Sequence, residues 1–431
     1  MRVGLAALVL LGAGLSSAGA GRQQPAHSPA PVHLGVQGRN NATPSIDALG
    51  EFVAVAWGAG TKEGGTDVFV AVSRDGGARF ADPVQANATP GEARLGGEMP
   101  PRVRLRRARG AADPDITVLW TARGEVTTIK LARSRDGGRT FGGAQILSAG
   151  KAGDRGWPAL ALDAAGTAHA IWLDHRGLAD SRTGAHAHRT SAPSDGVAMA
   201  QRSGLFFASA GPSGARGERE LVKGVCYCCK TALAAGRGRA IYAAWRQVYP
   251  GNIRDIAFSA SRDGGRTFSA PIRISEDGWE INGCPDDGPA MAVEDDGTVH
   301  VVWPTVMVSN GALEGALFHA STRNGRTFTR RTRVPTAGSP KPSHPQLAIA
   351  DGGGLIVAWD EVVAGRRTVF ARTLTPKRAG EMESGPLEIL SGDRPGTYPA
   401  LAAAAGSVLA AWTAGGSGES TIAVGAADRK R

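Results

Sequence analysis

The sequence of 431 residues predicts an all-β protein built from repeated four-stranded units. Three observations predict this class. Gly contributes 61 residues and separates many short apolar runs, an eight-residue turn recurs along the chain, and seven short apolar strands end in Trp. Long amphipathic patterns of helical period are absent, so the short runs are interpreted as strands. Four-stranded units repeated around an axis are the blades of a β-propeller.

The eight-residue turn is the most distinctive repeat. Its copies are S-R-D-G-G-A-R-F (73–80), S-R-D-G-G-R-T-F (134–141 and 261–268) and a divergent S-T-R-N-G-R-T-F (321–328), which has Arg323 at the Asp position. We expect the carboxylates of Asp75, Asp136 and Asp263 to accept hydrogen bonds from the amides of their own turns, while the glycines allow φ > 0. The final Phe then packs under the sheet. This motif predicts the connection between the third and the outer strand of a blade.

The strands that end in Trp give the number of blades. Their last residues are Trp57, Trp120, Trp172, Trp245, Trp303, Trp359 and Trp412. Most of them follow a short strand led by Pro, such as Y-P-A-L-A-A (398–403), and precede another, such as D-V-F-V-A-V (67–72). Seven Trp strands predict seven blades. The last unit lacks a fourth strand, and we expect the N-terminal segment V-H-L-G-V-Q-G (32–38) to supply it and close the ring.

The ends of the chain and one insertion complete the predicted organisation. An apolar run after Arg2 that ends in small residues predicts a secretory signal peptide over 1–20, followed by a disordered leader over 21–31. Residues 32–431 form a single propeller domain, with a lid-like insertion at about 176–204 that is too long and polar for a turn. No later stretch is apolar enough to span a bilayer. We therefore expect an extracytoplasmic protein, periplasmic or secreted.

The charge of the chain limits the classes of partner. The formal net charge is +10, but the arginines are scattered through turns, and the aromatic residues, 6% of the chain, do not interleave with them. This distribution argues against a nucleic-acid partner. It favours anionic surfaces or acidic ligands.

The eight-residue turn is the Asp-box, or BNR repeat, and the chain resembles the sialidase-type β-propeller superfamily over most of the predicted domain. Sialidases have six blades, so the resemblance makes six the alternative to seven. It also implies an active site on the face opposite the Asp-boxes, where the innermost strands begin and the loops after each Trp lie. Asp-boxes also occur in propellers that are not enzymes, so the resemblance leaves activity open.

The enzymatic interpretation assigns roles on that face. A sialidase-like hydrolase needs arginines for the substrate carboxylate and a Tyr nucleophile, for which the candidates are Arg155, Arg176, Arg246 and Tyr398. A paired-carboxylate mechanism would instead use Asp286, Asp287, Asp360 or Glu361. The Arg-Ile-Pro signature of the enzymes is replaced here by P-P-R-V-R-L (100–105). This interpretation predicts a glycoside hydrolase that acts on an acidic glycan.

The cysteines support a different interpretation. Cys226, Cys228 and Cys229 lie in V-C-Y-C-C-K at the start of one innermost strand, and Cys284 lies at the start of the next. A disulfide between the adjacent blades is geometrically easy, whereas a second one within C-Y-C-C is tight. The alternative is a soft-metal site for copper, or else zinc, with His344 and His175 as companion ligands.

Two functions therefore remain open. In the first, the protein is a binding or scaffold propeller with a cysteine-centred site, metal or disulfide, at its axial mouth. Its ligand there would be a small molecule, a glycan or a metal. In the second, it is the sialidase-like hydrolase described above.

Overall fold

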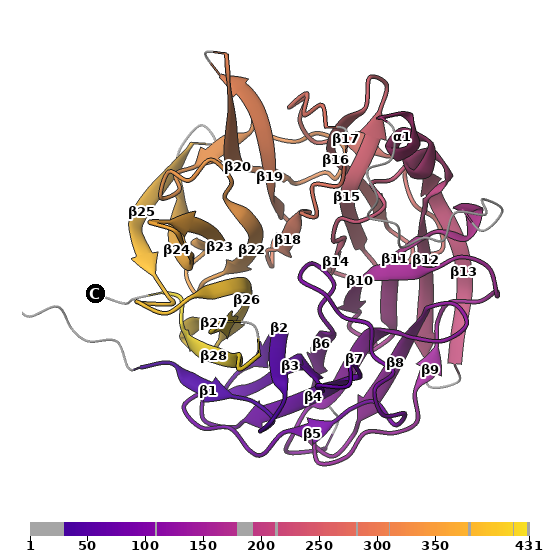
Figure 1. Cartoon of the computed structure of the whole chain (residues 1–431), viewed down its shortest axis with the longest axis vertical. Helices are drawn as coiled ribbons and strands as arrows, with labels where there is room; N and C mark the ends of the chain where they lie inside the picture. The colour runs from indigo at the N-terminus through magenta and orange to yellow at the C-terminus, as the bar shows by residue number, and fades with distance from the viewer. Residues whose placement is uncertain are drawn as a thin grey trace, which may run out of the picture.

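The computed structural model is a ring of seven four-stranded antiparallel blades around a central axis (Figure 1). It describes residues 30–107, 110–178, 193–211, 214–281, 283–309, 311–377, 381–416 and 418–428. The predicted fold class is confirmed, with seven blades rather than six. The predicted signal peptide (1–20) and nearly all of the predicted leader (21–31) lie outside the described residues.

The first four blades follow one another along the chain, each from its innermost to its outer strand. Blade one contains β2 (Asn40–Leu49), β3 (Phe52–Gly60), β4 (Thr66–Ser73) and β5 (Val84–Gln85). Blade two contains β6 (Arg102–Arg106), β7 (Asp115–Ala122), β8 (Thr128–Ser134) and β9 (Gln145–Ile146). Blade three contains β10 (Arg155–Leu162), β11 (Ala168–Asp174), β12 (Gly204–Gly211) and β13 (Gly214–Lys223). Blade four contains β14 (Ala232–Ala235), β15 (Ile241–Tyr249), β16 (Ile253–Ser261) and β17 (Ile272–Arg273).

The last three blades complete the ring, and the seventh combines three consecutive strands with β1 from the other end of the domain. Blade five contains β18 (Ala290–Val293), β19 (Val299–Ser309), β20 (Ala312–Thr322) and β21 (Thr332–Val334). Blade six contains β22 (Ser343–Ile349), β23 (Leu355–Val363), β24 (Arg366–Pro376) and β25 (Met382–Ile389). Blade seven contains β26 (Gly396–Ala404), β27 (Ser407–Ala414), β28 (Thr421–Ala426) and β1 (Val32–Leu34). Val32 of β1 pairs with Val424 of β28, which confirms the predicted closure.

The core lies between neighbouring blades. The second strands continue for two to six residues beyond the tryptophans at which the sequence predicted their ends. These seven tryptophans are buried, and each packs among Val, Ile, Leu and Ala side chains of its own and an adjacent blade. Five indole N–H groups also donate to a polar side chain, for example Trp57 to Asn41 at 2.9 Å and Trp359 to Glu361 at 2.9 Å. Because a buried indole N–H needs an acceptor, these polar residues belong to the core.

The eight-residue turns have the hydrogen bonds that the sequence predicts. Asp136 accepts from the Thr140 amide at 3.0 Å and from the Thr140 hydroxyl at 2.6 Å, and Asp263 makes the same two contacts with Thr267. Asp75 accepts from the Arg79 amide at 2.9 Å, and the Arg79 side chain lowers the pKa of Asp75 to about 2. The Gly76 amide donates to the Glu51 carbonyl, so the turn between first and second strands lies at the same end.

The divergent copy corrects the predicted register. Asn324, not residue 323, accepts the Thr327 amide at 2.9 Å, and Thr322 takes the place of the first Ser by accepting from the Gly325 amide. This turn is one residue shorter than the others, because it has one Gly where they have two. Arg323 is exposed and forms an ion pair with Asp296.

Part of the predicted lid-like insertion is described. It begins with a short 3-10 helix, η1 (Arg176–Leu178), and ends with α1 (Pro193–Arg202), while residues 179–192 lie outside the described part. Helix α1 contacts β13 and β15. Ser203, which follows it, accepts the Gly224 amide at 3.1 Å, so the end of the insertion lies beside the cysteine loop. None of the described helices is long and apolar enough to cross a bilayer.

Candidate functional site

The innermost strands begin with an unusual backbone feature that faces the end of the ring opposite the Asp turns. Thr43, Trp157, His344 and Tyr398 each precede a Pro, and each has φ between 50° and 57°. Each lies at a break in the register between the first two strands of its blade. Left-handed non-Gly residues are strained and cluster at functional sites, and a bulge changes the direction of a side chain. We call this end of the ring the axial mouth.

Titratable side chains from five blades meet below the mouth. They form the mouth cluster, which contains Glu98 before β6, Lys230 before β14, Asp287 before β18, His344 in β22 with Asp360 in β23, and Tyr398 in β26. All of them except the half-buried Tyr398 are buried. Convergence of buried ionisable groups on an axis is the usual mark of a binding or catalytic site.

Asp360 joins blades six and seven. Its carboxylate accepts from His344 Nδ1 at 2.8 Å, from the Thr397 hydroxyl at 3.0 Å and from the Tyr398 amide at 2.7 Å, and it forms an ion pair with Arg367. Burial alone would raise the pKa of Asp360, but the charge of His344 and their hydrogen bond hold it below the ordinary value. Asp360 is therefore ionised at neutral pH.

His344 and the half-buried Tyr398 lie side by side in the cluster. Their ring centroids are 4.3 Å apart. Burial alone would lower the pKa of His344, but the charge of Asp360 and the hydrogen bond between them raise it. Burial and the charge of Asp286 raise the pKa of Tyr398 to about 12, so its hydroxyl is protonated at neutral pH. The Tyr398 hydroxyl packs directly against Gly97, where a Cβ would lie 2.1 Å from the oxygen.

Glu98, Lys230 and Asp287 form the deeper part of the cluster. Lys230 Nζ lies 3.3 Å from Glu98 and donates to the Pro345 carbonyl at 3.0 Å. Glu98 also accepts the Gly288 amide at 3.0 Å, and Asp287 accepts the His344 amide at 3.1 Å. Burial and the nearby charge of Glu98 raise the pKa of Asp287 to about 6.

Sequence reasoning missed Glu98 and Lys230. Both lie in segments that lead into innermost strands, and only such a position could have signalled them: Glu98 precedes Met99-Pro100 and Lys230 directly follows C-Y-C-C. Asp287, Asp360, His344 and Tyr398 were predicted, and the structure brings them together. Asp286 is exposed at the mouth with φ of 48°.

A cavity of about 100 Å³ lies on the axis and is lined by residues of all seven innermost strands. Its charged lining residues are Arg102, Arg104 and Lys230, with no carboxylate among them. Arg102 Nε donates to the Pro158 carbonyl at 2.8 Å, while its buried Nη2 has no partner in the described structure. Burial, with the charge of Arg104, lowers the pKa of Arg102 to about 10, which leaves it charged at neutral pH. The cavity therefore favours negative charge.

The three predicted substrate-binding arginines are engaged elsewhere. Arg155 is fully buried and lies 3.4 Å from Asp174, which also pairs with Arg176 at 2.8 Å. Arg246 is buried and donates to the carbonyls of Asp287, Arg254 and Pro304. The structure therefore does not gather these arginines around one ligand carboxylate. Glu361 likewise is fully buried and accepts the Trp359 indole and the amides of Ala337 and Ser339.

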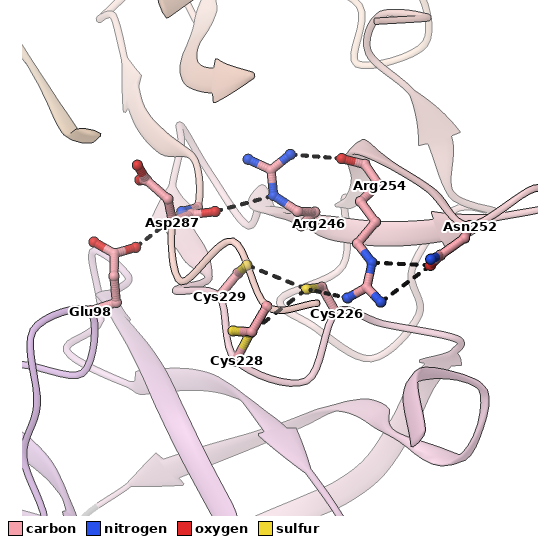
Figure 2. The surroundings of a disulfide bond; sticks show 10 residues. Glu98, Cys226, Cys228, Cys229, Arg246, Asn252, Arg254 and Asp287 are labelled. Atoms are coloured by element: carbon pink, nitrogen blue, oxygen red, sulfur yellow. Dashed lines mark hydrogen bonds between the residues drawn. A yellow bond between two sulfur atoms is a disulfide. The ribbon is translucent and has the colours of Figure 1, made fainter. Parts of the chain in front are cut away.

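The cysteine loop lies beside the mouth cluster. Cys228 forms a disulfide with Cys284 of the next blade, as expected for a bridge between blades, and leaves Cys226 and Cys229 as buried thiols. Cys226 Sγ is 3.4 Å from Cys229 Sγ and 4.0 Å from Cys228 Sγ. Figure 2 shows Cys226 between these two cysteines and Arg254, whose Nη1 donates to its sulfur at 3.1 Å. The Asp287 amide bonds Cys229, which links the loop to the mouth cluster.

The histidines predicted as companion ligands lie outside this sulfur group. His344 is bonded to Asp360, as described above. His175 lies beside the loop, since its ring bonds to the backbone of Tyr227 and its Nε2 has no partner in the described structure. Burial lowers the pKa of His175 to about 4, so its imidazole is neutral. Neither His joins the three sulfur atoms that lie within 4.8 Å of one another.

Comparison with known proteins identifies the fold. No protein-family model matches the sequence, and no curated protein matches it significantly. Among solved structures, a polysaccharide lyase of family PL25, an ulvan lyase bound to -[GlcA(1-4)Rha3S]-, is similar at 10% identity and a TM-score of 0.54, covering 93% of this chain and 98% of that chain. An α-L-arabinanase of Penicillium chrysogenum complexed with arabinobiose is similar at 12% identity and a TM-score of 0.51, with the same coverage.

A Hadza microbial sialidase also matches, at 15% identity over 84% of this chain and 73% of that chain, but with a TM-score of only 0.45. The likenesses to the lyase and the arabinanase show the fold alone. The chain is similar to propellers that include glycoside hydrolases and polysaccharide lyases.

Proposed function

We propose that the protein binds an acidic glycan at the axial mouth. The observation that carries this proposal is the mouth cluster itself, in which side chains of five blades converge on the axis. The similar lyase and arabinanase described above are named as carbohydrate-active proteins and are bound to sugars, which supports a carbohydrate ligand here. Strained residues at the starts of the innermost strands direct Trp157 and Tyr398, both half-buried, to this end of the ring.

The charges at the axis support an acidic ligand. Arg367 is part of the mouth, and its side chain is 35% exposed beside Asp360. Below it, the axial cavity is lined by Arg102, Arg104 and Lys230, of which Lys230 is paired with Glu98. An arginine fork binds carboxylate or sulfate groups through two parallel hydrogen bonds. Sugars that carry such groups therefore fit the mouth better than neutral sugars do.

Cleavage of the glycan is the second candidate function, and Tyr398 is the observation that favours it. A nucleophilic Tyr needs a lowered pKa, whereas burial raises the pKa of Tyr398. Its retained proton and its place against His344 suit a general acid that protonates the leaving oxygen of a glycosidic bond. Asp287, with its pKa raised to about 6, is a group able to exchange a proton near neutral pH.

Affinity electrophoresis tests the binding function. The protein is run through gels that contain a polyuronate or an uncharged polysaccharide of matched length. We expect retardation by the polyuronate alone, weakened about tenfold by Arg367→Gln. Arg326→Gln removes the same charge from an exposed turn on the opposite face and is expected to change nothing. Equal retardation by both polymers, or equal effects of both substitutions, would contradict the proposal.

Mass spectrometry of the polyuronate after incubation tests the second candidate. Hydrolysis adds one water to the products, whereas elimination leaves an unsaturated sugar, so the two reactions are distinguished by mass. If the protein cleaves, Tyr398→Phe should abolish the products while retardation in the gel persists. Retardation without any product from the unaltered protein would leave binding as its function.

A further inference from the structure

Three sulfur atoms of the cysteine loop lie close together in the interior. Cys226, Cys228 and Cys229 have sulfur atoms that all lie within 4.8 Å of one another, and all three residues are buried. The N-terminal part of the loop is fixed to β15, because the Cys226 amide donates to the Arg246 carbonyl at 2.9 Å and the Val248 amide donates to the Gly224 carbonyl at 2.8 Å. The edge of β15 therefore sets the position of Cys226, around which the other two sulfurs lie.

The spacing of these sulfurs fits a single metal ion. A metal–thiolate bond of about 2.3 Å places two sulfurs about 3.8 Å apart in tetrahedral and about 4.0 Å apart in trigonal coordination. The distances from Cys226 Sγ are 3.4 Å to Cys229 and 4.0 Å to Cys228, on either side of the tetrahedral value. In trigonal coordination the Cys226–Cys228 distance already fits, and the Cys226–Cys229 distance would lengthen from 3.4 Å to about 4.0 Å.

The charges around the loop also suit thiolates. Arg254 donates to Cys226 Sγ at 3.1 Å and is itself held by Asn252 Oδ1. Arg246, whose charge also acts on Cys226 and Cys229, is the second guanidinium group near the sulfurs (Figure 2). Three thiolates around a monovalent cation carry a net charge of −2, which the two guanidinium groups offset.

The disulfide decides whether the site is complete. Cys228 is bonded to Cys284, which is exposed, whereas the other three cysteines are buried. A dithiol reductant can therefore reach the bond at Cys284. It supplies two electrons and two protons, becomes a disulfide itself, and leaves Cys228 and Cys284 as thiols.

We propose that Cys226, Cys228 and Cys229 bind one Cu(I) ion as three thiolates once a dithiol has reduced the Cys228–Cys284 disulfide. Each thiol that binds releases its proton, and the oxidation state of the copper does not change. Copper(I) accepts soft thiolate ligands alone. Structural zinc takes four ligands, and within the described part of the chain no fourth Cys, His or carboxylate joins the group. This copper site does not require that the mouth bind a glycan.

Copper titration of the full chain tests the site. Protein reduced with a dithiol and desalted without oxygen is titrated with Cu(I) in competition with a chromogenic Cu(I) chelator. We expect one Cu(I) per reduced chain, with thiolate-to-copper absorbance in the ultraviolet, and less than a tenth of that for the oxidised chain. Reduced protein that leaves all copper with the chelator would overturn the proposal.

Two serine substitutions separate the ligands from the disulfide. Cys284→Ser removes the partner of Cys228 but none of the three ligands, so this variant should bind Cu(I) without prior reduction. Cys229→Ser should reduce the affinity at least tenfold, with circular dichroism showing that the propeller remains folded. If Cys229→Ser unfolds, the X-ray absorption spectrum of the copper-loaded Cys284→Ser protein decides. Three sulfur neighbours support the site, whereas a nitrogen ligand, or a Cys284→Ser protein without copper, rejects it.

Discussion

His344 and Tyr398 occupy equivalent bulges on neighbouring blades. Asp360 accepts a hydrogen bond from the His344 ring and another from the Tyr398 backbone amide. One carboxylate thus fixes a charged ring and a phenol whose centroids are 4.3 Å apart. Since Asp360 comes from a second strand, the core of blade six determines the geometry of the mouth.

Asp360→Asn is expected to destabilise the protein by about 3 kcal/mol. The substitution keeps the shape of the side chain but leaves the charges of His344 and Arg367 without their common partner in a buried place. Chemical denaturation at neutral pH measures the effect. Asp351→Asn, in an exposed turn, is the matched control and should change the unfolding free energy by less than about 0.5 kcal/mol. Equal effects of the two would count against the role given to Asp360.

The stability of the protein should fall as the pH rises through the range in which Asp287 ionises. The pKa of Asp287 is raised from 3.8 to about 6, so the folded state holds its proton more tightly than the unfolded state does. The stability linked to Asp287 is fully present below pH 3.8 and is lost as the pH rises through about 6. The raised pKa of His344 acts in the same direction at higher pH.

Asp287→Asn isolates this contribution. Its unfolding free energy relative to that of the unaltered protein should rise by on the order of 2 kcal/mol between pH 4 and pH 7. Urea denaturation across this range is the measurement. A difference that does not change with pH would show that the carboxyl of Asp287 titrates normally.

Gly97→Ala is expected to displace Tyr398, because a Cβ at residue 97 would lie 2.1 Å from the phenol oxygen. Gly96→Ala is the control, since nothing lies within 4 Å of a Cβ at that position. We expect a loss of about 1 to 3 kcal/mol in the first variant only, and weaker retardation by the polyuronate. Thermal unfolding and the gel assay measure these effects, and identical behaviour of the two variants would contradict the packing described here.

The register of the divergent turn can be tested by introducing the missing carboxylate. Asn324→Asp should raise the thermal midpoint by about 1 °C, because a carboxylate accepts more strongly from the Thr327 amide. Arg323→Asp places the acid where the sequence alignment predicts it, and we expect no increase. An increase for Arg323→Asp alone would restore the register predicted from the sequence.

The fold was predictable because its signals repeat. Every blade has a buried Trp within its second strand, and most have a Pro near the start of the innermost strand, because each blade makes the same packing contacts. The N-terminal strand was predictable because blade seven otherwise lacks an outer strand. The divergent turn was misaligned because it has one Gly where the other copies have two. An alignment without gaps does not detect a turn that is shorter by one residue.

The site was predicted only in part because proximity to the mouth does not show where a side chain is used. Arg155 and Arg246 both lie toward the correct face of the ring. Arg155, however, is buried beside Asp174, and Arg246 is buried and donates to the Asp287 carbonyl. Glu98 and Lys230 have no motif, and only the folded ring brings together residues that are 132 positions apart. The choice of Cys228 as the partner of Cys284 likewise depends on how the loop bends at the edge of β15.

The pairing of β1 with β28 has a consequence for how the molecule assembles. His33 and Thr421, 388 positions apart, are hydrogen-bonded across this pair. β1 therefore has no partner until β28 has been synthesised, and blade seven cannot form before then. Contacts between such distant positions slow folding, and until they form the unpaired edge of β28 can associate with other chains. Loss of β1 or β28 would therefore leave blade seven incomplete and its strand edge unpaired.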